Sequence, residues 1–185
     1  MEFKEFSKIA RLSRDCVITE KLDGTNASVY IGEDGEFLTG SRNRWITPEG
    51  DNFGFSRWAH EHKDELLLLG PGHHFGEWWG SGVQRGYGLP KGEKRFSLFN
   101  TARWEDDAAR PKCCHVVPVL YKGPFSSAAA DDMIEWLRNN GSAAAPGFMK
   151  PEGVIIWHSA SRTLFKKTIE GDEAPKSLAL RELEA

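Results

Sequence analysis

The sequence predicts an α+β domain with an antiparallel sheet core and helices inserted between hairpins. Short apolar runs separated by glycine-containing turns outnumber the helical stretches, which is typical of sheet proteins. The 19 glycines, 11 phenylalanines and seven tryptophans among 185 residues also indicate a β-rich fold with aromatic side chains in its core. Runs of strands with helices inserted between them favour the α+β class.

The predicted strands have the composition and alternation of half-buried segments. They cover residues 15–20, 27–31, 36–40, 73–79, 95–100, 115–120, 153–159 and 162–169. The turn dipeptide Asp23-Gly24 predicts a β-hairpin between the first two, with Lys21 at its end. In the fifth strand, Phe96 and Leu98 share one face while Ser97 and Phe99 share the other.

Helical periodicity appears in residues 55–69, which Gly70-Pro71 closes, and in residues 127–140. Ser126 or Ser127 can cap the start of the second helix, and Gly141 can end it. Residues 174–184 predict a short terminal helix.

We expect residues 1–185 to form one domain, because the loop 141–151 leaves only 34 residues after it. The first residues lack the apolar run of a signal peptide, and the apolar run at 66–69 is too short to span a bilayer. We therefore expect a cytoplasmic protein with no membrane association.

Charge and cysteine content exclude some classes of function. The net charge of −3 argues against general electrostatic binding of nucleic acid, although basic clusters at 42–44, 91–95 and 166–167 can form a local track. Three cysteines do not make a disulfide framework, so we expect reduced thiols. The adjacent Cys113, Cys114 and His115 lack the usual spacing of zinc ligands.

Lys21 is the first candidate for chemistry. Half-burial at a strand end, with cations nearby, favours the neutral amine that attacks phosphorus or carbonyl centres. The four residues Lys21-Leu22-Asp23-Gly24 are a weak pattern on their own, and a solvated lysine on a surface hairpin is the alternative.

Other candidates follow along the chain. Arg42 comes just after a strand and can bind a phosphate. Glu77 lies in an apolar, glycine-rich strand and needs a partner, either a ribose hydroxyl pair or a core arginine. Phe99 can stack on a planar base or pack in the core. Glu152 precedes a strongly apolar strand, and Lys166-Lys167 lie in the last one.

Taken in order, these motifs resemble those of the covalent nucleotidyltransferases, and within them the ATP-dependent RNA ligases of the second bacteriophage type. The resemblance runs from Glu20 to about Thr168. It rests on Glu20-Lys21 with Gly24-Thr25-Asn26, Phe75-Gly76-Glu77 with Gly82-Val83-Gln84-Arg85, Phe99, Glu152-Gly153-Val154, and Leu164-Phe165-Lys166.

The resemblance implies an antiparallel, ATP-grasp-like ligase adenylation domain and a three-step reaction. Lys21 attacks the α-phosphate of ATP and holds AMP, the AMP passes to a 5′-phosphate end, and a 3′-hydroxyl then displaces it. The resemblance implies that Lys21 and Lys166 are catalytic and that Glu152 binds Mg²⁺ or Mn²⁺, directly or through water. It implies that Glu20 and Phe99 bind the adenine and that Glu77 binds the ribose. The phosphates are expected to contact Asn26, Arg42 and Lys166.

The sequence also departs from the family pattern. Asn100 follows Phe99 where close relatives have an acidic residue. Lys166 and Lys167 are adjacent, whereas the family has one residue between its two lysines, so both cannot face one pocket; we assign Lys166 and keep Lys167 as the alternative. We expect no appended C-terminal or OB domain, which leaves room for a partner protein that grips nucleic acid.

Other readings of the motifs remain open. The RNA ends can be nicked or single-stranded, and the same fold can serve a minimal DNA-nick ligase or a capping guanylyltransferase. A nucleotide- or nucleic-acid-binding module without catalysis is the alternative from another class.

Overall fold

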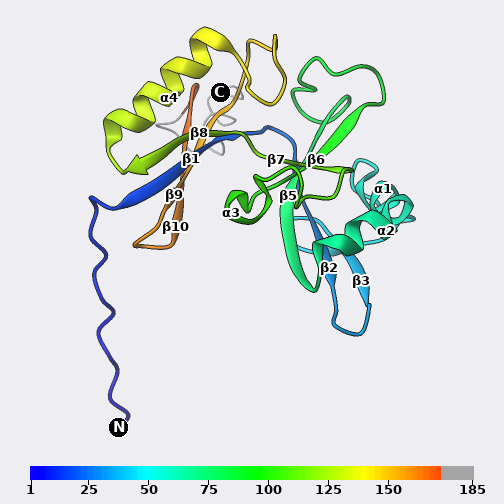
Figure 1. Cartoon of the computed structure of the whole chain (residues 1–185), viewed down its shortest axis with the longest axis horizontal. Helices are drawn as coiled ribbons and strands as arrows, with labels where there is room; N and C mark the ends of the chain where they lie inside the picture. The colour runs from blue at the N-terminus through cyan, green and yellow to red at the C-terminus, as the bar shows by residue number, and fades with distance from the viewer. Residues whose placement is uncertain (172–185) are drawn as a thin grey trace, which may run out of the picture.

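The computed structural model describes residues 1–171, and in this part of the chain ten strands form two sheets. The four-stranded sheet consists, in spatial order, of β10 (Thr163–Thr168), β9 (Gly153–His158), β1 (Asp15–Lys21) and β8 (Val119–Pro124). The six-stranded sheet consists of β4 (Trp45–Ile46), β3 (Phe37–Gly40), β2 (Thr25–Ile31), β5 (Gly72–Gly80), β6 (Lys94–Leu98) and β7 (Cys114–Val116). Figure 1 shows the sheets next to each other, with helices packed on them. The predicted α+β class is confirmed.

Helix α4 (Ser127–Asn140) covers one face of the four-stranded sheet. Ile134 of the helix packs in one apolar cluster with Ile18 of β1. The Ser126 side chain accepts a hydrogen bond from a backbone N–H of the first turn, and Gly141 follows the last residue with φ 78°. Both ends of this helix therefore agree with the prediction from sequence.

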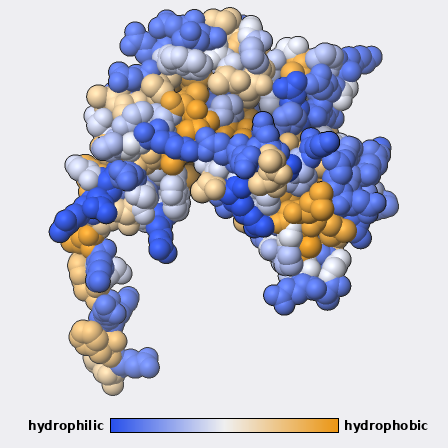
Figure 2. Space-filling model, viewed as in Figure 1, coloured by the Kyte–Doolittle hydropathy of each residue, from blue (hydrophilic) through white to orange (hydrophobic). Residues whose placement is uncertain are grey.

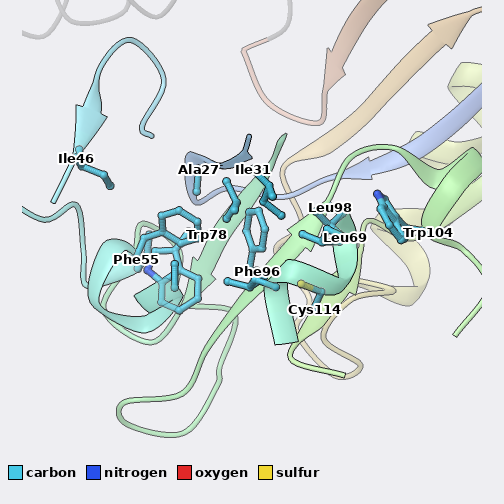
Figure 3. Close-up of a cluster of buried hydrophobic side chains, with 14 residues drawn as sticks. Ala27, Ile31, Ile46, Phe55, Leu69, Trp78, Phe96, Leu98, Trp104 and Cys114 are labelled. Carbon is cyan, nitrogen blue, oxygen red and sulfur yellow. The ribbon is translucent and has the colours of Figure 1, made fainter. Parts of the chain in front are cut away.

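The larger core lies between the six-stranded sheet and the helical segment α1 (Phe55–Glu61), α2 (Lys63–Leu66) and the 3-10 helix η1 (Leu67–Leu69). Aromatic rings fill its centre. The ring centroid of Phe55 lies 5.5 Å from that of Trp78 and 5.0 Å from that of Phe96 (Figure 3). This burial anchors β5 and β6, which carry candidate site residues on their opposite face.

A third, smaller cluster joins the two sheets. Its buried members are one residue of β5, Trp79, and four residues of the segments that connect the elements: Leu22, Tyr87, Val117 and Ala145. The connections from β1 to β2 and from β7 to β8 thus pack against one another, which holds the ends of β1 and β5 at a fixed junction.

The predicted hairpin at Lys21 is wrong. β1 pairs with β8 and β9, whereas β2 pairs with β3 and β5, so the turn crosses from one sheet to the other. Gly24 is required in this crossing, because a Cβ there would lie 2.4 Å from the carbonyl oxygen of Trp78. Tight packing against β5, rather than a hairpin turn, explains the glycine.

Several element boundaries also differ from the prediction. The expected strand 115–120 is divided between β7 and β8 in different sheets, with Pro118 in the gap. β7 pairs with β6 in parallel, an exception to the expected antiparallel pattern. The expected helix 55–69 is broken at His62. The expected helix 174–184 lies outside the described residues.

Two short elements were not predicted. β4 is two residues long, and α3 (Thr101–Trp104) is four residues long. Asn100 caps α3, since its side chain accepts a hydrogen bond from the Arg103 N–H. The residue that departs from the family pattern therefore has a local structural function.

The N-terminal segment before β1 extends away from the body of the molecule (Figure 1). Figure 2 shows hydrophobic and hydrophilic residues interleaved along it. Its large apolar side chains, Phe3, Phe6, Ile9 and Leu12, are 69–92% exposed. Among residues 1–171, no helix has the length and apolar character that crossing a membrane requires.

Candidate active site

Lys21 ends β1 beside a buried carboxylate. Antiparallel pairing places Lys21 opposite Gly153 of β9, which brings the preceding Glu152 next to it. The Lys21 Nζ and Glu152 Oε2 form an ion pair. The Lys21 side chain is 22% exposed and that of Glu152 is 4% exposed. The pair therefore holds the amine at a defined position that a ligand can still reach.

Glu77 of β5 approaches the same turn from the other sheet. Its carboxylate accepts hydrogen bonds from Asn26 Nδ2 at 2.9 Å and from the Gly24 N–H at 3.2 Å. Burial raises the pKa of Glu77 to about 7, and the Asn26 hydrogen bond and the charge on Lys21 limit the rise. A buried acid whose pKa is this high is typical of a functional site.

Glu20 precedes Lys21 and points to the opposite side of β1. Its Oε2 accepts hydrogen bonds from the Ala143 N–H at 2.8 Å and the Ala144 N–H at 3.0 Å. Its Oε1 is buried and has no hydrogen-bond partner among the described residues. Burial raises the pKa of Glu20, and the nearby Ser142 hydroxyl and the two backbone N–H groups oppose that rise. An unpartnered buried acceptor is costly, which favours a ligand donor at this position.

The register of β10 separates Lys166 from Lys167. Ile155 of β9 lies opposite both Thr19 and Lys166, so Lys166 projects from the face of the sheet that carries Lys21. Lys167 projects toward α4, where its Nζ lies 2.6 Å from Asp131 Oδ1. Strand alternation thus places the two lysines on opposite faces.

Phe99 and Arg42 lie outside this set of contacts. Phe99 directly follows β6, and its N–H bonds to the Phe75 carbonyl oxygen at 2.9 Å. It shares a sheet face with Glu77, because Glu77 pairs with Ser97 and side chains alternate. The Phe99 side chain is 42% exposed. Arg42 is exposed in the turn between β3 and β4.

The contacts bring together Lys21, Glu152, Glu77 and Asn26. Lys166 lies on the Lys21 face, whereas Glu20 and Lys167 lie on the side of α4. Among residues 1–171, no three histidine, cysteine, aspartate or glutamate side chains form a cluster that can hold a metal ion. A divalent ion at Glu152 would therefore take other ligands from a bound phosphate and water.

A family model described as RNA ligase matches residues 14–168. The chain belongs to the RNA ligase family. A comparison with curated proteins finds no match.

Solved structures of Naegleria gruberi RNA ligase share the fold of this RNA ligase family member. A mutant with AMP and Mn matches with a TM-score of 0.63 and 20% identity over 85% of this chain and 50% of that chain. A mutant with ATP and Mn matches with a TM-score of 0.60 and 19% identity over 92% of this chain and 53% of that chain. The present chain thus spans about half the length of these structures.

Two residues without a predicted role hold the Lys21 turn of this RNA ligase family member. Arg85 Nε donates to Asp23 Oδ2 at 2.8 Å, and its Nη1 donates to the Lys150 carbonyl oxygen at 2.9 Å. The hydroxyl of Tyr87 accepts a hydrogen bond from the Asp23 N–H at 2.8 Å. Arg85 thereby links the turn after Lys21 to the loop before Glu152. The glycines after Glu77 indicate a loop at this place, but nothing in the sequence indicates which residues Arg85 and Tyr87 contact.

Proposed function

We propose that this protein is an ATP-dependent RNA ligase of the second bacteriophage type, acting through a covalent lysyl-AMP intermediate. The observation that carries the proposal is the partly exposed Lys21 amine held by buried Glu152 where the two sheets meet. Membership of the RNA ligase family supports it. Naegleria structures of the same fold with ATP or AMP and Mn support the choice of nucleotide and ion.

Adenine recognition is assigned to Glu20 and Phe99. The free Oε1 of Glu20 is an acceptor, and the adenine amino group is a donor that guanine lacks at that position. Phe99 offers an exposed ring for stacking. These two residues thus favour ATP over GTP.

Glu77 is assigned to the ribose hydroxyls, which are donors that suit a buried carboxylate. Asn26 donates to Glu77 and fixes its orientation. We also retain Asn26 and Arg42 as contacts to phosphate, as the family resemblance implies. Arg42 is exposed in its turn, so its side chain is accessible to a phosphate of ATP or RNA.

In the first step, Lys21 Nζ forms a bond to the α-phosphorus while the bond to pyrophosphate breaks. The amine must lose a proton, and the Glu152 carboxylate that contacts it is placed to accept that proton. Lys166, on the same sheet face, is assigned to stabilise charge on the phosphate. Glu152 also has the oxygen ligands that suit Mg²⁺ or Mn²⁺, and such an ion supplies positive charge to the phosphate oxygens.

In the later steps, a 5′-phosphate end takes the AMP and a 3′-hydroxyl displaces it. These steps also need contacts to RNA, in addition to the nucleotide contacts assigned so far. The proposal includes a partner protein that provides additional contacts to the RNA.

The test is incubation with α-labelled ATP and Mg²⁺ or Mn²⁺, followed by denaturing electrophoresis. We expect a labelled protein band that is lost in Lys21→Ala and kept in Lys112→Ala, which changes an exposed lysine. Absence of a band with any nucleotide contradicts the proposal. Labelling by GTP alone identifies a guanylyltransferase, sealing of nicked DNA alone a DNA ligase, and RNA binding without an adduct a non-catalytic module.

A further inference from the structure

Exposed aromatic side chains line the face of the six-stranded sheet that carries Glu77. Strand pairing aligns one row across this face: Trp45, Gly40, Ser28 and Phe75. Phe99 extends the row, because its N–H bonds to the Phe75 carbonyl oxygen. The core containing α1 and α2 covers the other face of the sheet (Figure 1).

His73, two residues before Phe75 on the same face of β5, stacks with two of these rings, and we call the set Trp45, His73 and Phe75 the aromatic column. The His73 ring is stacked 5.4 Å from Trp45 and 4.1 Å from Phe75, measured between centroids. The His73 Nε2 lies 3.0 Å from Ser28 Oγ, which fixes the ring. Gly40 lies beneath the column, where a Cβ would be 2.6 Å from Ser28 Oγ and 3.3 Å from the indole of Trp45.

The two outer rings of the aromatic column are about half exposed to solvent. Trp45 is 52% exposed and Phe75 is 54% exposed. Large aromatic surfaces left in water are unfavourable, and their fixed stacking means that little side-chain entropy is lost when another ring is added. A flat aromatic ligand is therefore the partner that suits both ends.

Position and charge identify that ligand. Phe75 lies two residues before Glu77 on the same strand face, beside the assigned nucleotide site. Arg42 and Arg44 are exposed in the turn that leads into Trp45. Stacking rings next to arginines are typical of single-stranded nucleic-acid sites, since bases in a duplex hide their faces against each other.

We propose that the aromatic column binds unpaired bases of the RNA strand whose end is joined, with Arg42 and Arg44 contacting its phosphates. This inference rests on the proposed ligase function and adds a preference for single-stranded RNA near the reacting end. Because any base can stack on an aromatic ring, we expect the site to prefer single-stranded over double-stranded RNA and to show little preference for sequence.

The experiment measures binding of fluorescein-labelled oligouridylate, without ATP, by anisotropy. An abasic oligomer of the same length and a blunt RNA duplex are the comparison ligands. Trp45→Leu removes one end of the column, Trp45→Phe keeps an aromatic ring, and Trp136→Leu is a control at a similarly exposed tryptophan on α4. Phe75→Leu is the second variant if Trp45→Leu does not keep the wild-type melting curve.

We expect Trp45→Leu to weaken oligouridylate binding by about five- to 150-fold, the range for one stacked base. Trp45→Phe should recover most of the binding, and Trp136→Leu should leave it unchanged. The abasic oligomer should bind wild type weakly and be insensitive to the substitution. Unchanged oligouridylate binding, or equal losses for the abasic oligomer or the duplex, would overturn the proposal. If wild type forms a dimer that Trp45→Leu disrupts, and RNA binding is unchanged, the proposal would also be overturned, in favour of a protein contact.

The two proposals fail separately because the binding assay does not require adenylylation. If the lysyl-AMP adduct forms but binding of single-stranded RNA does not depend on the aromatic column, only the proposed RNA site is rejected. Column-dependent binding without an adduct rejects the ligase assignment alone.

Discussion

Replacing Glu77 by glutamine tests the electrostatics of the site directly. Glu77 is 8% exposed, and its carboxylate accepts hydrogen bonds from Asn26 and Gly24. Glutamine keeps the shape and one acceptor but cannot ionise. The difference in unfolding free energy between wild type and Glu77→Gln therefore isolates the titration of this one carboxyl group.

The size of the effect follows from the pKa. Burial raises the pKa of Glu77 from 4.5 to about 7. At about 1.4 kcal/mol for each pH unit between these values, the linked change in stability is about 3 kcal/mol. Because the folded pKa is the higher one, this stability is fully present below about pH 4.5 and is lost as the pH rises through about 7.

Urea denaturation from about pH 4 to about pH 8 measures this change. We expect the stability of wild type to fall by about 3 kcal/mol relative to Glu77→Gln over that range. Glu61→Gln, at an exposed position on α1, controls for the change in net charge. The difference in unfolding free energy between wild type and Glu77→Gln could instead stay constant within about 0.5 kcal/mol over this pH range. That result would refute the argument that burial raises the pKa of this carboxyl group.

Three further predictions concern the same region. Arg85→Met removes the link between the Lys21 turn and the loop before Glu152, and we expect adduct formation to slow about tenfold or more. Lys166→Ala should slow adduct formation about 10- to 100-fold, whereas Lys167→Ala, on the α4 side, should change it less than about threefold. Gly24→Ala should destabilise the fold by about 1–3 kcal/mol in urea denaturation. Gly50→Ala, where a Cβ would lie an ordinary 3.7 Å from Thr47 Oγ1, should do so by less than about 0.5 kcal/mol.

Each of these predictions has a result that contradicts it. Wild-type labelling kinetics in Arg85→Met would show that the link does not position Lys21, and Arg85→Lys serves as its charge-preserving control. A larger effect of Lys167→Ala than of Lys166→Ala would reverse the assignment of the two lysines. Equal stability of the Gly24→Ala and Gly50→Ala variants would mean that the connection from β1 to β2 can accommodate a Cβ at residue 24, contrary to the contact distances.

Local features were predicted well where neighbouring residues decide them. The ends of α4 depend on Ser126 and Gly141, which lie beside the helix in sequence. The placement of Phe96 and Ser97 on opposite faces of β6 depends on strand geometry alone. Short elements were not predicted. The two residues of β4 show too little periodicity to be recognised as a strand.

Strand partners were not predictable from local sequence. The Asp23-Gly24 dipeptide favours a hairpin, but β1 and β2 join different sheets, and Gly24 packs against Trp78. Likewise, Arg85 lies 62 residues from Asp23, and nothing in either local sequence indicates that they meet.

The sequence by itself determined the fold class, the ordered motifs that resemble RNA ligases, and the rule that adjacent lysines in a strand face opposite ways. Only the tertiary structure decided that Lys166 shares the Lys21 face, since this depends on pairing with β9 and on the packing of α4. It also decided that Glu152 contacts Lys21 and that Trp45, His73 and Phe75 stack. These contacts join residues far apart in the chain, and their free energy comes from burial and pairing that no short segment contains.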